Sequence, residues 1–92
     1  MPGRLHDADY AAFVEHLVAT RKRLGITQAD LSQKLNRPQS YVSKFERLER
    51  RLDVGEWRLA MIALGQDPAA MFAEVCQDLV QSDAVESRKK AP

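Results

Sequence analysis

Cysteine is almost absent from this chain, which has Cys76 alone among its 92 residues. An intramolecular disulfide is therefore excluded, and nothing indicates an oxidising compartment. No apolar run approaches the roughly 18 residues that a membrane-spanning helix needs, and the N-terminal segment lacks the charged-then-apolar layout of a signal peptide. We therefore expect a cytoplasmic protein that does not enter a membrane. Cys76 is interpreted as a small core residue, with an intersubunit disulfide or a redox sensor as the alternative.

Catalytic and metal-binding signatures are also missing. The two histidines, His6 and His16, have no cysteine nearby at metal-ligand spacing, and the chain has no glycine-rich phosphate loop or nucleophile motif. We therefore predict no catalytic residue, no metal site and no cofactor, which favours a binding protein over an enzyme.

No segment shows the two-residue alternation of apolar and polar side chains that is typical of a β-strand, and every segment favours helix. A 45% apolar content and this length suit a single globular domain. The sequence predicts an all-α, five-helix domain over residues 1–80. A flexible tail is expected over residues 81–92, which contain little to bury. Helices are expected over about 8–24, from 27 to a corner at 36–38, from 39, from 53 to 64 and over about 68–80. Asp53 and Glu56 are expected to cap the fourth of these helices.

The corner between the second and third helices is written in the local sequence. Thr27 and Asp30 have the spacing of a helix-capping box, with Asp in place of Glu. Asn36 tolerates a positive φ better than any residue except glycine. Pro38 cannot continue one helix but suits the start of the next. This segment therefore predicts two short helices joined by a tight turn, as in helix-turn-helix motifs.

Positive charge is concentrated on the same segment. Residues 21–51 contain nine basic and three acidic side chains, a net charge of +6, whereas residues 1–20 sum to −2 and 52–92 to −3. Such a basic patch is typical of proteins that contact nucleic acid. A solvated charged face on an ordinary helical bundle is the competing interpretation.

The third helix carries side chains suited to the major groove of DNA. Gln39 can pair with adenine, Lys44 can donate to guanine, and Ser40 and Ser43 are short, permissive contacts. Basic and polar side chains around the corner are expected to hold phosphates, which set register without reading sequence. These candidates are Gln28, Arg37, Tyr41, Arg47, Arg50 and Arg51.

Residues 10–70 resemble the lambda-repressor/Cro-like, or XRE-type, helix-turn-helix domain of bacterial and phage regulators. The resemblance is carried by RKRLGITQADLSQKL (21–35), QSYVSKFER (39–47), ERRLD (49–53) and ALGQDP (63–68). It implies a five-helix bundle in which the third helix reads DNA through Gln39, Ser40 and Lys44, with Ser43 nearby. Gln28 is similar to a phosphate-binding glutamine that also braces the first residue of that helix. Arg21 and Glu46 are similar to an ion pair that clamps helix one to helix three.

Two departures from the family pattern stand out. Leu48 occupies a position that is commonly glycine, so either helix three continues past it or the leucine accepts a strained turn. Leu59 and Ile62 are apolar where the family is usually polar. Either helix five covers them, or they join a dimer interface. The residues proposed for that interface are Leu59, Ile62, Met71, Phe72, Val75 and Leu79.

Double-stranded DNA is therefore the expected partner, and we expect a homodimer that acts as a sequence-specific transcriptional regulator, a repressor, on a palindromic operator. The alternative is an interaction module such as an antitoxin, which binds a protein partner and regulates its own gene through DNA.

Overall fold

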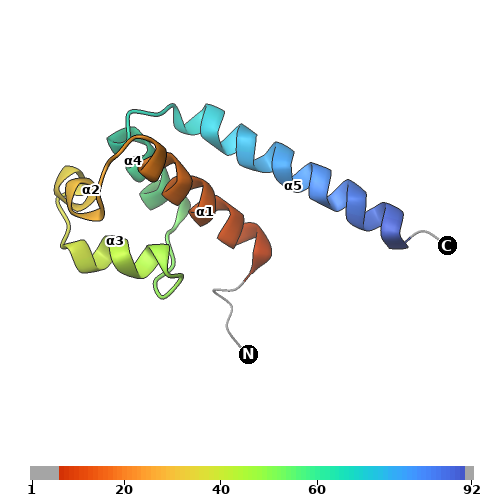
Figure 1. Cartoon of the computed structure of the whole chain (residues 1–92), viewed down its shortest axis with the longest axis horizontal. Helices are drawn as coiled ribbons and strands as arrows, with labels where there is room; N and C mark the ends of the chain where they lie inside the picture. The colour runs from red at the N-terminus through yellow and green to blue at the C-terminus, as the bar shows by residue number, and fades with distance from the viewer. Residues whose placement is uncertain (1–6, 91–92) are drawn as a thin grey trace.

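Five helices make up the computed structural model, which describes the backbone of residues 7–90 and the side chains of residues 7–81 (Figure 1). They are α1 (Ala8–Arg23), α2 (Gln28–Leu35), α3 (Gln39–Glu46), α4 (Val54–Ala63) and α5 (Pro68–Lys90). No strand occurs in this described part, so the all-α prediction is confirmed.

Capping side chains set where most helices begin. Asp7 accepts hydrogen bonds from the amides of Asp9 and Tyr10, at 2.8 and 3.2 Å, and so begins α1. Both halves of the predicted Thr27–Asp30 capping box are formed, at 3.0 and 3.1 Å. These bonds satisfy amide groups that have no partner within a helix. The predicted starts of α1 and α2 are therefore confirmed.

The turn after α2 has the predicted conformation, and the turn after α3 shows which of the two alternatives for Leu48 is correct. Asn36 is left-handed with φ 56°, and Pro38 is extended with ψ 153° just before α3. Leu48 has φ 63°, and α3 has already ended at Glu46. Helix three therefore does not continue past Leu48, and the leucine adopts the strained turn. A left-handed conformation costs a non-glycine residue roughly 1–2 kcal/mol. Hydrogen bonds from the Leu48 and Glu49 amides to Phe45 and Lys44 carbonyls support it.

A single core lies where the helices meet. α2 packs against α3 and α4, α1 against α3 and α5, and α4 against α5. All five helices contribute fully buried side chains, and those that are 0% exposed are Leu17, Leu31, Val42, Phe45 and Met61. Burying a side chain of this size stabilises a fold by about 1.5–3 kcal/mol. The core holds α3 by its inner side, which leaves its other side facing outward.

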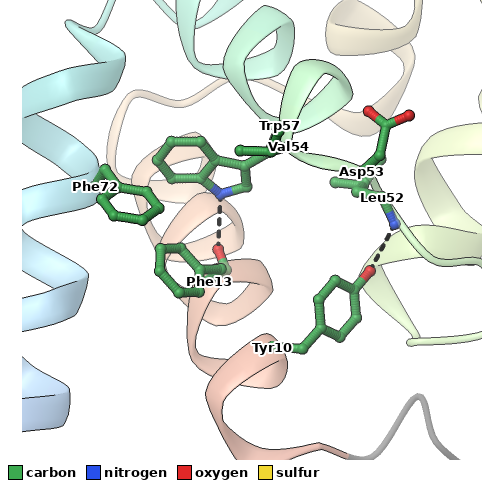
Figure 2. Close-up of a pocket in the computed structure, with 7 residues that line it drawn as sticks. All are labelled: Tyr10, Phe13, Leu52, Asp53, Val54, Trp57 and Phe72. Carbon is green, nitrogen blue, oxygen red and sulfur yellow. Dashed lines mark hydrogen bonds between the residues drawn. The ribbon is translucent and has the colours of Figure 1, made fainter.

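An aromatic cluster joins α1, α4 and α5 beside this core (Figure 2). Phe13 lies 5.7 Å from Trp57 and 5.0 Å from Phe72, between ring centroids. The Trp57 indole donates to the Phe13 carbonyl at 3.1 Å, and the Leu52 amide donates to the Tyr10 hydroxyl at 2.8 Å. These buried polar groups are therefore satisfied, and an apolar cavity of about 190 Å³ lies beside them.

The last helix continues beyond its predicted end. The backbone of α5 is helical to Lys90, whereas the sequence predicted an end near residue 80. Residues 81–90 contain no glycine or proline, so nothing in them interrupts a helix once it has started. In Figure 1 this blue end of α5 extends past α1. The side chains of residues 82–90 and the whole of residues 91–92 lie outside the described part of the chain. The division into a domain over residues 1–80 and a flexible tail over residues 81–92 stays a prediction.

No single helix in the described part is long and apolar enough to span a membrane; α4 and residues 68–81 of α5 have that composition together but are bent by 115°.

Candidate nucleic-acid interface

The outward face of α3 presents the predicted base-reading residues. Gln39, Ser40 and Lys44 are exposed and Ser43 is partly exposed, whereas Val42 and Phe45 are 0% exposed. An α-helix turns by about 100° per residue, so positions 39, 40, 43 and 44 share one side. The fold thus brings these four candidates together on a helix that the core holds in place. DNA contact by each remains a prediction.

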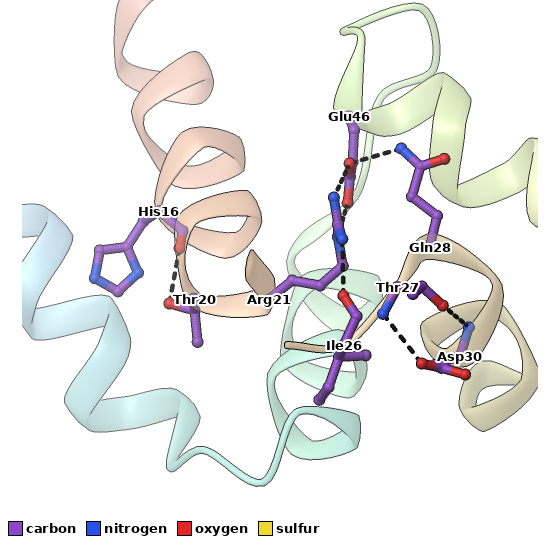
Figure 3. A network of polar contacts seen from close by, with 8 residues as sticks. All are labelled: His16, Thr20, Arg21, Ile26, Thr27, Gln28, Asp30 and Glu46. Carbon is purple, nitrogen blue, oxygen red and sulfur yellow. Dashed lines mark hydrogen bonds and ion pairs between the residues drawn. The ribbon is translucent and has the colours of Figure 1, made fainter. Parts of the chain in front are cut away.

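A buried ion-pair cluster borders this face on the side of α1 and α2 (Figure 3). Arg21 donates to both oxygens of Glu46, at 2.6 and 2.9 Å, and to the Ile26 carbonyl at 2.8 Å. The two side chains are only 9% and 7% exposed. The structure therefore contains the clamp between α1 and α3 that the resemblance implied. Because it is buried, the small stabilisation typical of exposed pairs does not describe it.

Gln28 belongs to the same cluster, with a different partner from the one expected. Its side-chain amide donates to Glu46 at 2.9 Å, whereas the sequence resemblance implied a contact with Gln39, the first residue of the recognition helix. Glu46 has two carboxylate oxygens near the α2 N-terminus and attracts the amide as a charged acceptor. Gln28 remains partly exposed beside the start of α2, where helix amides favour a phosphate.

A second charged cluster borders the opposite side of α3. The guanidinium carbons of Arg37 and Arg50 lie 4.8 and 4.6 Å from the centroid of the Tyr41 ring. Arg50 also donates to both oxygens of Glu56, at 3.3 and 3.1 Å. These four side chains connect α3 to the corner before it, the loop after it and α4. Both long sides of α3 are consequently edged by side chains with phosphate-binding chemistry.

The pKa shifts in this second cluster follow from its contacts. Hydrogen bonds from Arg50 and then from the Asp53 amide hold the pKa of Glu56 below its usual range. Burial, followed by the negative charge of Glu56, raises the pKa of Tyr41. Glu56 is therefore ionised and Tyr41 protonated near neutral pH.

Two other phosphate candidates lie apart from these clusters. Arg47 pairs with Glu49 at 3.1 Å, and both side chains are more than half exposed. Arg51 lies over the ring of Tyr10 at 4.3 Å, so it is directed toward α1. Arg47 directly follows α3, where its amide donates to the Ser43 carbonyl at 3.1 Å, so it extends the end of that helix.

The predicted interface residues divide into two groups. Met71 and Val75 are 5% and 2% exposed, because they pack into the chain's own core and leave little surface for a second copy. Leu59, Ile62 and Phe72 are 54%, 45% and 43% exposed, and Leu79 is partly exposed. The idea that α5 covers Leu59 and Ile62 is therefore wrong. Contact with a second copy stays a prediction.

Sequence reasoning missed the role of Glu56 in this site. The sequence predicts Asp53 and Glu56 only as a capping pair, and the structure contains that capping box, at 2.7 and 3.0 Å. The partner Arg50 lies six residues earlier, across a loop whose course depends on the conformation of Leu48. No helical spacing marks such a pair, so nothing in the sequence pointed to it.

No group of three or more His, Cys, Asp or Glu side chains within the described residues is placed to hold a metal ion.

Comparisons with known proteins agree on the kind of domain. A helix-turn-helix family model matches residues 17–70, which include α2 and α3 completely. A solved structure described as an XRE-family like protein, from Pseudomonas syringae pv. tomato str. DC3000, is 44% identical with a TM-score of 0.73. The match covers 76% of this chain and 85% of that one. No curated protein matches the chain.

Proposed function

The chain belongs to the XRE-type helix-turn-helix family of DNA-binding transcription regulators, and we propose that it is a sequence-specific repressor. In this proposal a homodimer binds a palindromic operator, and α3 of each copy enters the major groove. The observation that carries the proposal is the outward face of α3, on which Gln39, Ser40 and Lys44 are exposed while the opposite side is buried.

Base reading is assigned to this face. The groove is about 12 Å wide and admits one helix, and side chains near the helix N-terminus reach the base edges first. Gln39 is the first residue of α3 and has both a donor and an acceptor for adenine. Lys44 lies farther along and offers a cation to guanine. Ser40 and Ser43 fill the space between them.

Phosphate binding is assigned to the two edges of α3. Gln28 supports the edge beside α2, and Arg37, Tyr41 and Arg50 support the edge beside the corner and loop. The exposed side chain of Arg47 and the exposed Arg51 add positive charge nearby. Such contacts contribute affinity that depends on salt and is independent of sequence.

The dimer is assigned to the exposed apolar surface of α4 and α5. Leu59, Ile62 and Phe72 lie outside the core, and large apolar surfaces on soluble domains commonly mark contacts with other proteins. A two-fold dimer doubles the number of bases read, with half-sites about one helical turn apart. The same surface also fits a different protein partner, as in the antitoxin alternative.

Selection of bound sequences from random DNA tests the proposal most directly. We expect a palindrome whose half-sites are one or two helical turns apart. Gln39→Ala should weaken binding to the selected operator by about 1–3 kcal/mol and leave binding to random duplex unchanged. No enriched sequence, or equal loss on both duplexes, would overturn specific reading by α3. A monomer that co-purifies with the product of a neighbouring gene would favour the antitoxin alternative.

A further inference from the structure

The charged cluster on the Tyr41 side of α3 contains an acid where a DNA-binding surface would be expected to carry only positive charge. Arg37 and Arg50 lie against the Tyr41 ring, and Glu56 of α4 binds Arg50 through both of its oxygens. An acid beside DNA repels phosphate. Its presence here therefore needs a compensating role.

Arg50 keeps one binding edge open despite its bonds to the protein. Its Nη1 donates to Glu56 and to the Arg51 carbonyl at 3.1 Å, and its Nη2 donates to Glu56. The Nε–H and the second hydrogen of Nη2 have no partner among the described residues, and the side chain is 38% exposed. These two N–H groups point the same way, as the fork that binds two oxygens of one phosphate.

The contacts around Arg50 fix the direction of this fork. Glu56 is itself held by the Asp53 amide at 3.0 Å in the capping box of α4, so it is a stationary partner. The Tyr41 ring supports the flat guanidinium from another direction and also supports Arg37. An unrestrained arginine would lose side-chain entropy on binding, and a held one loses less.

We propose that Glu56 is a positioning residue that turns the Nε/Nη2 edge of Arg50 outward, so that Arg37 and Arg50 together hold one backbone phosphate beside α3. The proposal rests on the DNA-binding function above, although it does not depend on sequence-specific reading. Glu56 itself touches no DNA in this arrangement. It weakens the long-range attraction of DNA and improves a short-range contact.

These two effects have opposite signs, which makes the proposal testable. Removing the charge of Glu56 should strengthen DNA binding if the acid only repels phosphate. It should weaken binding if the acid positions Arg50. Glu49 is the matched control, because it also pairs with an arginine near α3 but is 54% exposed and takes no part in the cluster.

The experiment measures binding of the full chain to a labelled random-sequence duplex over a range of salt concentrations. We expect Glu56→Gln to weaken binding by about tenfold, as for loss of one well-formed charged hydrogen bond. Glu49→Gln should leave binding unchanged or strengthen it. Equal strengthening by both changes would overturn the proposal. A random duplex is used so that the result does not require an operator to exist.

An Arg50→Ala background separates positioning from folding. There the Glu56→Gln change should no longer weaken binding, because the residue acts through Arg50. If it still weakens binding by tenfold, Glu56 acts through the fold and the proposal is wrong. Should Glu56→Gln fail to fold, Arg50→Lys is the second variant. It keeps the charge but lacks the fork, so it should weaken binding by about tenfold; unchanged binding would overturn the proposal.

Discussion

Glu46 shows how much depends on one buried carboxylate. It accepts from Arg21 and Gln28, and only 7% of its side chain is exposed. Glu46→Gln leaves the Arg21 guanidinium buried without a countercharge, which should lower the free energy of unfolding by about 3 kcal/mol. Chemical denaturation measures this loss. The control is Glu49→Gln in the exposed pair with Arg47, which should cost less than about 1 kcal/mol. Equal losses would show that burial adds nothing to the Arg21–Glu46 pair.

Glu56 gives a pH dependence whose sign follows from its lowered pKa. A carboxyl that loses its proton more readily when folded stabilises the fold above its unfolded pKa. That contribution is lost as the pH falls through the lower, folded pKa. Unfolding curves of the wild type and Glu56→Gln should therefore differ at neutral pH and converge in acid. A difference that stays constant down to acid unfolding would contradict the assignment.

Individual residues also show where sequence reasoning succeeds and fails. The contact of Arg21 with Glu46 was accessible because the family resemblance aligns both residues. The contact of Arg50 with Glu56 was not, because it spans a loop that turns at Leu48 with a positive φ. A side-chain pair across such a turn depends on backbone angles that residue type only weakly favours.

At the scale of helices, one glycine lies within α4 and another lies just after it. Replacing each by alanine should change the stability of the protein in opposite directions. Gly65 lies two residues after the end of α4 and has φ 75°. A Cβ added there would meet no atom within 4 Å. Gly65→Ala should thus destabilise the protein by about 1 kcal/mol, through backbone strain alone. Gly55 lies within α4, and its added Cβ would lie 3.4 Å from Asp53 Oδ1, an ordinary contact. Gly55→Ala should stabilise by about 0.5 kcal/mol. Thermal melting compares the two, and a shift of the same sign would refute this account.

Helix starts were predictable because capping is local, and the end of α5 was not. Thr27 with Asp30 and Asp53 with Glu56 satisfy amides within four residues, so the sequence alone reveals them. The predicted end of α5 near residue 80 assumed that a helix needs apolar residues to bury. The backbone is helical to Lys90, and helix-forming residues without a breaker are enough to continue one.

For the whole molecule, the unpartnered surface is the feature that a single copy leaves unexplained. The core accounts for Met71 and Val75, while Leu59 and Ile62 point away from it and remain about half exposed. The sequence marked α4 as apolar on too many sides but could not divide its residues between core and surface. That division depends on how α5 crosses α4, which is a property of packing rather than of either helix.

The dimer proposed for this surface should separate when a charge is placed on it. Leu59→Glu is expected to weaken self-association by at least about tenfold, because a charge would be buried without a partner. Sedimentation measures the change. Leu24→Glu is the control, since Leu24 is an apolar residue that follows α1, is 39% exposed and is not among the proposed interface residues. Leu59→Glu should also abolish the advantage of a two-site operator over one half-site, while binding to the half-site persists because α3 is unaltered. The dimer proposal would be wrong if the wild type is monomeric without DNA and binds the two-site operator no more tightly than one half-site. Leu59 and Ile62 would then be assigned to contact with a different protein.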